Sequence, residues 1–162
     1  MDKSKKIMFF SLLSILFLSV VIIFIVGVVR TNMVQNDPRQ KTFLAGKVPS
    51  KMPDGLHKGS APGYNGSWQG KKFDAKAKTG INLFKNGDKT SEQYSFKTYV
   101  AKGVQDDMEV IKIDYNIPEN PWNLRLILDE IVETKPGTYL GKLHVTLIPG
   151  LPFTVMYFNL EK

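Results

Sequence analysis

The sequence contains no cysteine. Disulfide bonds, thiolate metal sites and cysteine nucleophiles are therefore all excluded. A lipid anchor attached through cysteine is excluded for the same reason. The lack of cysteine does not identify the compartment in which the protein works.

Histidine is almost as scarce, because His57 and His144 are the only two and lie far apart in the sequence. A hydrolytic zinc site needs about three protein ligands in a compact cluster. No Gly-x-Ser-x-Gly elbow is present, and the glycine-rich residues 59–70 lack the Gly-Lys-Ser/Thr ending of a phosphate loop. We therefore expect no metal and no familiar catalytic set, and the sequence leans against an enzyme without excluding one.

The formal net charge is +7, but the basic residues are not clustered into a patch typical of nucleic-acid binding. Lys3, Lys5, Lys6 and Arg30, offset by Asp2, carry part of it and flank a long apolar run. The rest is spread over about 130 residues, which describes a mildly basic domain. We expect no nucleic-acid partner, and attraction to anionic lipid headgroups is the more natural use of the flanking charges.

Residues 7–29 contain no charged side chain. A helix of about 23 residues, at roughly 1.5 Å rise per residue, is long enough to cross a ~30 Å hydrocarbon core. No proline interrupts this run, so its backbone can stay fully hydrogen bonded in lipid. The sequence predicts a short tail over residues 1–6 and one transmembrane helix over 7–29.

A cleaved signal peptide is the alternative, since the basic start fits one. However, the run exceeds the roughly 7–15 apolar residues of a signal peptide, and no small-x-small cleavage pattern follows it. We therefore expect a retained single-pass anchor in the cell membrane. Basic residues on the two sides of the helix nearly balance. The three lysines packed close to its start favour a cytoplasmic N-terminus and a domain on the non-cytoplasmic side.

Beyond the helix the chain divides into two parts. Residues 30–65 are rich in proline and glycine without apolar periodicity, which predicts a linker. In residues 66–162, short runs of aromatic and β-branched residues alternate with turn residues, which predicts strands. The seven expected strands lie near 68–75, 80–84, 94–102, 108–115, 123–133, 138–147 and 153–160. Short connections favour a mainly β, antiparallel meander that closes into a small barrel, with a two-sheet sandwich as the main competitor.

One hairpin can be registered from its sequence. If Glu133 faces Thr138 across a four-residue loop, Leu128 faces Leu143 and one face becomes an apolar ladder. The opposite face then pairs Asp129 with Lys142. The other predicted pairs are Leu126 with Val145, Leu124 with Leu147, Ile127 with His144, and Arg125 with Thr146.

The segment Gly66-Ser67-Trp68-Gln69-Gly70 resembles the Gly-x-Trp that opens the barrel in calycins, the lipocalin and fatty-acid-binding superfamily, and more closely the opening of nitrobindin-like barrels. The resemblance spans residues 66–162 in architecture and these five residues in motif. It implies a calycin-like barrel in which Trp68 closes one end and the interior holds a lipophilic molecule or haem. Haem would then be ligated by His144, and no other cofactor is expected. The arginine that lipocalins stack on this tryptophan is missing from residues 153–160.

These features favour a membrane-anchored module that binds a small lipophilic or amphipathic ligand. Arg125, Lys142 and His144 would receive a carboxylate or similar head group, with aromatic side chains around its tail. The alternative is that this polar face is simply exposed to solvent. The candidate ligand-binding residues are Trp68, Tyr99, Arg125, Asp129, Lys142 and His144. Trp122 follows a turn and would line the barrel mouth or sit at the membrane interface.

Two other functions stay open. In the first, the protein is an accessory subunit of a membrane complex, and its β domain docks on partner proteins. Ser11, Ser14 and Gly27 would then belong to a helix-packing face of small residues. In the second, it is an enzyme such as an isomerase. That would require an acid or base inside the barrel with a shifted pKa.

Overall fold

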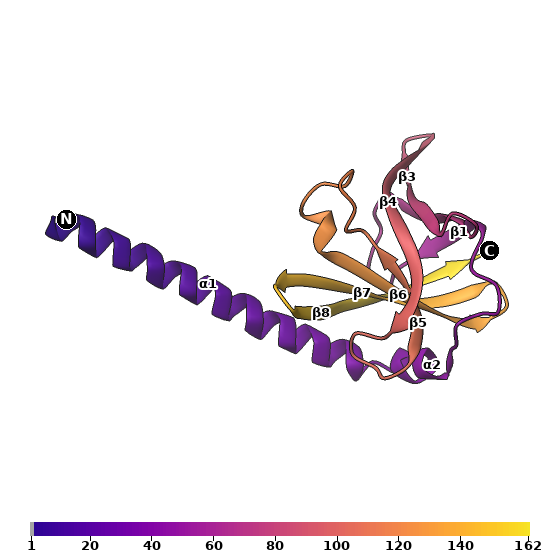
Figure 1. Cartoon of the computed structure of the whole chain (residues 1–162), viewed down its shortest axis with the longest axis horizontal. Helices are drawn as coiled ribbons and strands as arrows, with labels where there is room; N and C mark the ends of the chain where they lie inside the picture. The colour runs from indigo at the N-terminus through magenta and orange to yellow at the C-terminus, as the bar shows by residue number, and fades with distance from the viewer. Residues whose placement is uncertain (1) are drawn as a thin grey trace.

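The computed structural model describes residues 2–162, in which a long helix leads into an antiparallel β-barrel (Figure 1). Helix α1 spans Lys3–Gln35 and the short helix α2 spans Arg39–Ala45. The strands are β1 (Gly55–Ser60), β2 (Trp68–Asp74), β3 (Thr79–Asn86), β4 (Lys89–Lys102), β5 (Glu109–Asp114), β6 (Ile127–Lys135), β7 (Thr138–Ile148) and β8 (Leu151–Glu161). A 3-10 turn, η1, covers Leu124–Leu126. The predicted fold class is confirmed.

The barrel is closed because β8 pairs back onto β1, with Lys58 opposite Glu161. Every other strand pairs antiparallel with the next one along the chain. Closure removes exposed strand edges and rules out the two-sheet sandwich. The closing strand β1 and helix α2 both lie within residues 30–65, the range predicted as a linker. The structure thus has one strand more than the seven expected among residues 66–162.

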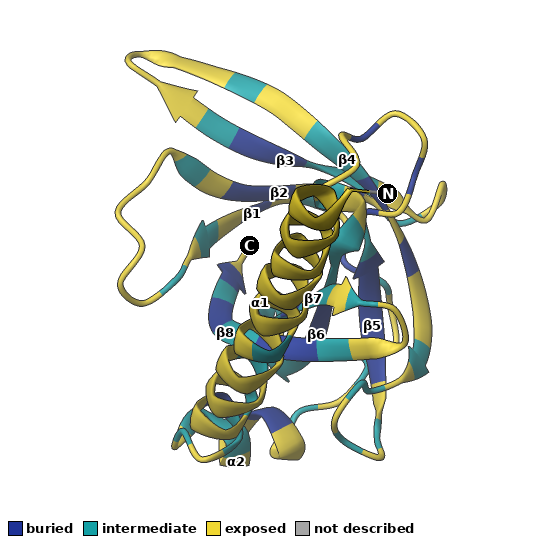
Figure 2. Cartoon of the chain, turned by 90° about the vertical axis from the view of Figure 1, so that its left-hand side faces the viewer, coloured by how far each residue is buried: buried dark blue, intermediate teal, exposed yellow. Residues whose placement is uncertain are grey.

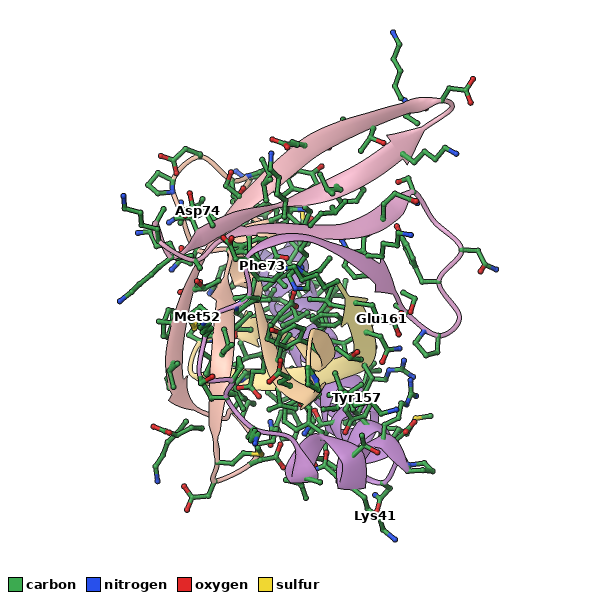
Figure 3. The ribbon with its side chains drawn as sticks, turned by 90° about the vertical axis from the view of Figure 1, so that its right-hand side faces the viewer. Lys41, Met52, Phe73, Asp74, Tyr157 and Glu161 are labelled. Atoms are coloured by element: carbon green, nitrogen blue, oxygen red, sulfur yellow. The ribbon has the colours of Figure 1, made fainter. Side chains whose placement is uncertain are left out.

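Aromatic and branched side chains fill one end of the barrel interior. The buried cluster comprises Phe73, Phe96, Ile111, Ile113, Tyr115, Ile131, Tyr139, Phe158 and Leu160. Phe73 lies among the densely packed interior side chains (Figure 3) and meets Phe96 edge to face, with ring centroids 5.4 Å apart. These residues recur at every second position of their strands, as expected for one face of a pleated sheet.

A second apolar cluster lies outside the barrel, beneath α2 and the end of α1. It contains Val34, Phe43, Val110, Val132, Leu140 and Tyr157. Phe43 of α2 is completely buried, and Tyr157 lies next to the helical region (Figure 3). After α2, the backbones of Lys47 and Glu133 exchange two hydrogen bonds of 3.2 and 2.8 Å. Residues 34–47 are thereby packed onto the barrel wall.

Helix α1 projects far beyond the barrel, and its apolar side chains are largely exposed (Figure 2). Within residues 2–162 it is the one helix long and apolar enough to cross a membrane. A signal sequence near an N-terminus satisfies the same criterion. Its C-terminal turns pack on β8, where a Cβ atom added at Gly27 would lie 2.5 Å from the Phe153 ring.

The register predicted for the β6–β7 hairpin is wrong by one residue. Glu133 faces Tyr139, and Asp129 faces Leu143. The loop is a two-residue turn, Pro136-Gly137, in which Gly137 has φ +75°. A bulge between Glu133 and Lys135 then shifts the pairing. The predicted pairs Asp129–Lys142, Leu128–Leu143 and Ile127–His144 therefore do not form, and residues 124–126 form a 3-10 turn in place of strand. Asp129 and Lys142 lie on opposite faces of the sheet.

The docking of α2 can be tested with two adjacent substitutions. Phe43→Ala removes a fully buried ring and should lower the free energy of unfolding by about 3–5 kcal/mol. Leu44→Ala is the matched control, because Leu44 is 51% exposed and should change stability by roughly 0.5 kcal/mol or less. Urea unfolding of the full chain in detergent micelles, followed by near-ultraviolet circular dichroism, measures both. Equal effects would contradict the packing of α2 on the barrel.

Candidate functional site

A cavity of about 470 Å³ lies in the barrel next to the buried aromatic cluster, with which it shares Tyr115 and Phe158. Its wall is mostly apolar and aromatic and includes Tyr64, Trp68, Phe84, Leu143, Met156 and Phe158. The strands that supply these residues are joined through the β1–β2, β3–β4, β5–β6 and β7–β8 connections. Its volume lies within the roughly 300–1,000 Å³ typical of small-molecule sites.

Four buried polar residues interrupt this apolar wall: Lys71, Asn82, Tyr115 and Asp129. Lys71 Nζ lies 3.0 Å from Asp129 Oδ2 and donates a 2.9 Å hydrogen bond to Asn82 Oδ1. The Tyr115 hydroxyl accepts a hydrogen bond from Lys71 and donates one of 3.3 Å to Asp129 Oδ2. Each residue is at most 5% exposed, so the polar cluster is shielded from solvent.

Aromatic rings surround the Lys71 ammonium. Its nitrogen lies 5.1–5.4 Å from the ring centroids of Trp68, Phe96, Tyr115 and Phe158, within the range of cation–π attraction. Burial lowers the pKa of Lys71, and the Asp129 carboxylate opposes this effect. Burial, together with the Asp129 charge, raises the pKa of Tyr115 well above 10. Tyr115 is therefore a neutral hydroxyl at physiological pH.

The carboxylate of Asp129 is only partly satisfied. Its Oδ1 atom is buried and has no hydrogen-bond partner among residues 2–162. The three donor positions of Lys71 are matched by Asp129, Asn82 and Tyr115. The group left without a partner at the cavity wall is thus an acceptor. A buried unpaired acceptor is unfavourable, and a guest that donates a hydrogen bond would satisfy it.

The cluster also meets one condition set above for an enzyme, an interior base with a shifted pKa. However, Lys71 Nζ is already donating to its three partners, which leaves it poorly placed to take a proton from a substrate. Holding a polar group by hydrogen bonding is the chemistry that this geometry supports best.

The structure brings together two of the six predicted site residues. Trp68 and Asp129 both line the cavity, and Trp68 Nε1 donates a 3.1 Å hydrogen bond to Asn82 Oδ1. Tyr99 is 40% exposed on β4. Arg125 is exposed in η1, with its Nε 3.0 Å from Asn116 Oδ1. The expected trio of Arg125, Lys142 and His144 does not converge, because the last two lie on the outer face of β7.

Lys142 and His144 belong to a charged group beneath the β4–β5 loop. His144 Nε2 lies 3.2 Å from Glu130 Oε2, and Lys112 makes an ion pair with Glu130 Oε1. Lys142 Nζ lies 2.5 Å from Asp106 Oδ2 and 4.3 Å from the centroid of the Phe43 ring. Burial would raise the pKa of Glu130, but His144 and Lys112 outweigh it, so the pKa is lowered. These contacts tie the loop to the barrel.

This placement also bears on haem. His144 Nδ1 lies 3.0 Å from Thr154 Oγ1, and its other nitrogen faces Glu130. Because His144 is buried on the outer face and does not line the cavity, it could not ligate a haem held there. The residues present do not fit this cofactor.

Lys71, Asn82 and Tyr115 were not predicted as site residues. The two-residue period of the strands could have identified them as inward-facing, since side chains two residues apart lie on the same face of a sheet. Lys71 precedes Phe73 by two residues, Asn82 precedes Phe84 by two, and Tyr115 follows Ile113 by two. A polar residue in step with buried apolar residues marks an inward-facing position.

No protein-family model, curated protein or solved structure was found to match this chain.

The interior ion pair predicts non-additive mutational effects. Asp129→Leu alone should destabilise the protein by about 3–5 kcal/mol, because it leaves the Lys71 ammonium buried and unpaired. Adding Lys71→Met should recover much of this loss, since the double variant buries no charge. Urea unfolding of both single variants and the double variant gives the coupling energy. Additive effects would contradict the pair.

The lowered pKa of Glu130 predicts that the folded protein loses stability in acid. Its pKa in the folded protein lies below the usual 4.5, so its contribution is fully present above pH 4.5. The contribution is lost as the pH falls through the lowered folded value. The stability difference between the wild type and Glu130→Gln should therefore shrink below pH 4.5, as measured by urea unfolding across a pH series. A constant difference would contradict the lowered pKa.

Proposed function

We propose that this protein is a membrane-anchored binding module whose barrel holds a small lipophilic or amphipathic ligand. The observation that carries the proposal is the mostly apolar cavity of about 470 Å³ with the unpartnered Asp129 oxygen in its wall. The closed barrel of eight antiparallel strands is compatible with a calycin-like fold. A lipocalin-like or nitrobindin-like relationship is part of this proposal.

The polar cluster narrows the chemistry of the ligand. Lys71 and Asp129 neutralise one another, and the acceptor left over favours a hydroxyl or amine donor on the guest. A carboxylate head would face the Asp129 carboxylate inside a poorly solvated cavity, where repulsion between like charges is strong. We therefore expect a ligand with an apolar body and a head group that donates a hydrogen bond, in place of the carboxylate head expected from the sequence.

Helix α1 is the anchor in this proposal. Its length and apolar composition support a transmembrane span over residues 7–29. Lys3, Lys5 and Lys6 favour a cytoplasmic N-terminus, with the barrel on the non-cytoplasmic side. Such a tether keeps the cavity close to the bilayer, where lipophilic molecules concentrate.

Two of the small residues in α1 already make contacts within the chain. Gly27 receives the ring of Phe153, and Ser14 Oγ donates to the backbone oxygen of Phe10. The Ser14 bond lies within the helix and leaves its surface free, but Phe153 covers Gly27, which weakens the case for a helix-packing face there and hence for the accessory subunit.

Ligand binding can be read from Trp68. Trp122→Phe leaves Trp68 as the one tryptophan, located in the cavity wall. Titrating dodecanol into this variant in lipid nanodiscs should change the Trp68 emission saturably. Dodecanoic acid at neutral pH should bind about tenfold or more weakly, because it loses one charge-assisted hydrogen bond and adds repulsion.

Two further variants control this titration. Ala61→Phe adds bulk at the cavity wall and should abolish the saturable change. Lys71→Met combined with Asp129→Leu should remove the preference for the alcohol. Native mass spectrometry of the full chain complements the titration, since it would reveal a small molecule that co-purifies. A linear emission change in every variant, with no bound mass, would overturn the proposed function.

A further inference from the structure

We propose that two connections of the barrel dip into the membrane interface beside α1 and open the cavity to the bilayer. We call them the membrane rim: the β7–β8 tip, residues 147–151, and the β5–β6 loop around Trp122. This inference rests on the anchoring role of α1 in the proposed function. It adds the orientation of the barrel and the route by which a ligand reaches the cavity.

Helix α1 and strand β8 run side by side in the same direction. Val34 and Tyr157 share the outer cluster. Nearer the hairpin, Arg30 Nε donates a 2.6 Å hydrogen bond to the Val155 oxygen, and Thr31 Oγ1 accepts one of 2.9 Å from the Thr154 nitrogen. Moving along α1 towards its N-terminus therefore also leads towards the β7–β8 tip.

The tip reaches the level of the apolar part of α1. The rings of Phe24 and Phe153 meet edge to face, with centroids 6.3 Å apart. Arg30 is the first charged residue after the uncharged run and marks where a span would leave the hydrocarbon. Phe24 lies on the order of 9 Å further along the helix axis, at about 1.5 Å per residue. This matches the ~5–10 Å depth at which interfacial segments insert.

The composition of the hairpin fits that depth. Residues 145–156 contain no charged side chain. Leu147 and Leu151, on either side of the Pro149-Gly150 turn, are 55% and 37% exposed. Their strands remain paired up to the tip, with Ile148 opposite Leu151. Exposed apolar side chains gathered at one tip are unfavourable in water and favourable in the bilayer interface.

The β5–β6 loop provides a second contact. It carries Trp122, which is 76% exposed. The loop and the β7–β8 hairpin both extend towards the side on which the N-terminal part of α1 lies (Figure 1). An exposed indole is favoured at a membrane interface, where its apolar body and its N–H group are both accommodated. Two points of contact besides α1 define the tilt of the barrel on the membrane.

The β5–β6 loop and the strands that lead to the β7–β8 tip form part of the cavity wall. Leu124 of the β5–β6 loop and Ile127 at the start of β6 line it on one side, and Leu143 of β7 and Met156 of β8, below the tip, line it on the other. With the rim inserted, a lipophilic ligand would pass from the bilayer into the cavity without entering bulk water. The site thus takes molecules dissolved in the membrane.

Site-directed spin labelling tests the rim, and the absence of cysteine makes each label unique. The full chain carrying Leu147→Cys is labelled with a nitroxide and reconstituted in phosphatidylcholine vesicles. The label should collide more with oxygen, which dissolves in lipid, than with a water-soluble nickel chelate. Lys76→Cys is the matched control, because Lys76 is exposed in the turn between β2 and β3 at the other end of the barrel. A label at position 76 should collide more with the nickel chelate than with oxygen. Similar accessibility at both sites would overturn the inference.

Trp122 gives an independent readout. Trp68→Phe leaves Trp122 as the one tryptophan. Its emission should lie at shorter wavelength than in water and be quenched by lipids brominated near the headgroup. Emission like that of free tryptophan, without quenching, would contradict insertion of the β5–β6 loop.

The fate of the rim can be separated from that of the proposed function. If the labels lie in the membrane but the dodecanol titration fails, the membrane rim is supported and the proposed ligand binding is contradicted. Saturable dodecanol binding together with a water-exposed label at position 147 would support the proposed function and overturn the membrane rim. Mass spectrometry of the chain recovered from cell membranes should find residues 1–29 attached. A chain cleaved near residue 29 would overturn the rim, because the anchor that sets its depth would be absent.

Discussion

The pairing of β1 with β8 is the constraint on which the other features depend, because it closes the sheet and divides every strand into an inward and an outward face. Some inward positions form the buried aromatic cluster, and others surround the cavity next to it. Outward positions on β5 to β8 receive α2 and the end of α1. Once the ring is closed, the face on which a side chain lies decides whether it meets the barrel interior, a helix or solvent.

Closure also explains why the protein has two buried groups of charges with different roles. On the outer face, Glu130 is surrounded by Lys112, His144 and the Val104 N–H, whose 2.6 Å hydrogen bond joins the β4–β5 loop to the barrel. On the inner face, Lys71 and Asp129 pair within the cavity wall and leave one carboxylate oxygen without a partner. Buried ion pairs add little net stability. The incomplete inner cluster is therefore the feature on which the proposed recognition of a polar group rests.

Helix α1 is structurally continuous with the barrel. Helix α1 extends through Gln35, and α2 and Lys47 contact the wall soon afterwards. Hydrogen bonds from Arg30 and to Thr31 fix the helix along β8. A flexible linker would allow the barrel to rotate freely above a membrane. A helix packed on the strand that closes the barrel instead gives the cavity a defined direction relative to α1, which the proposed ligand exchange with the bilayer requires.

Local patterns in the sequence determined the long apolar helix and most of the strands, because long apolar runs, period-two alternation and Asn-Gly or Pro-Gly turns act within a few residues. They also indicated a closed barrel. Trp68, which was expected from the calycin resemblance, and Asp129, which was expected from the wrong hairpin register, both line the cavity. Tertiary structure decided the rest. Strand β1 has little intrinsic strand pattern and forms by pairing with β2 and β8. A bulge near Thr134 changed the register by one residue, which moved Lys142 and His144 to the opposite face from Asp129. The cluster of Lys71, Asn82, Tyr115 and Asp129 assembles from strands β2, β3 and β6 and the end of β5, so its geometry exists only after the ring has closed.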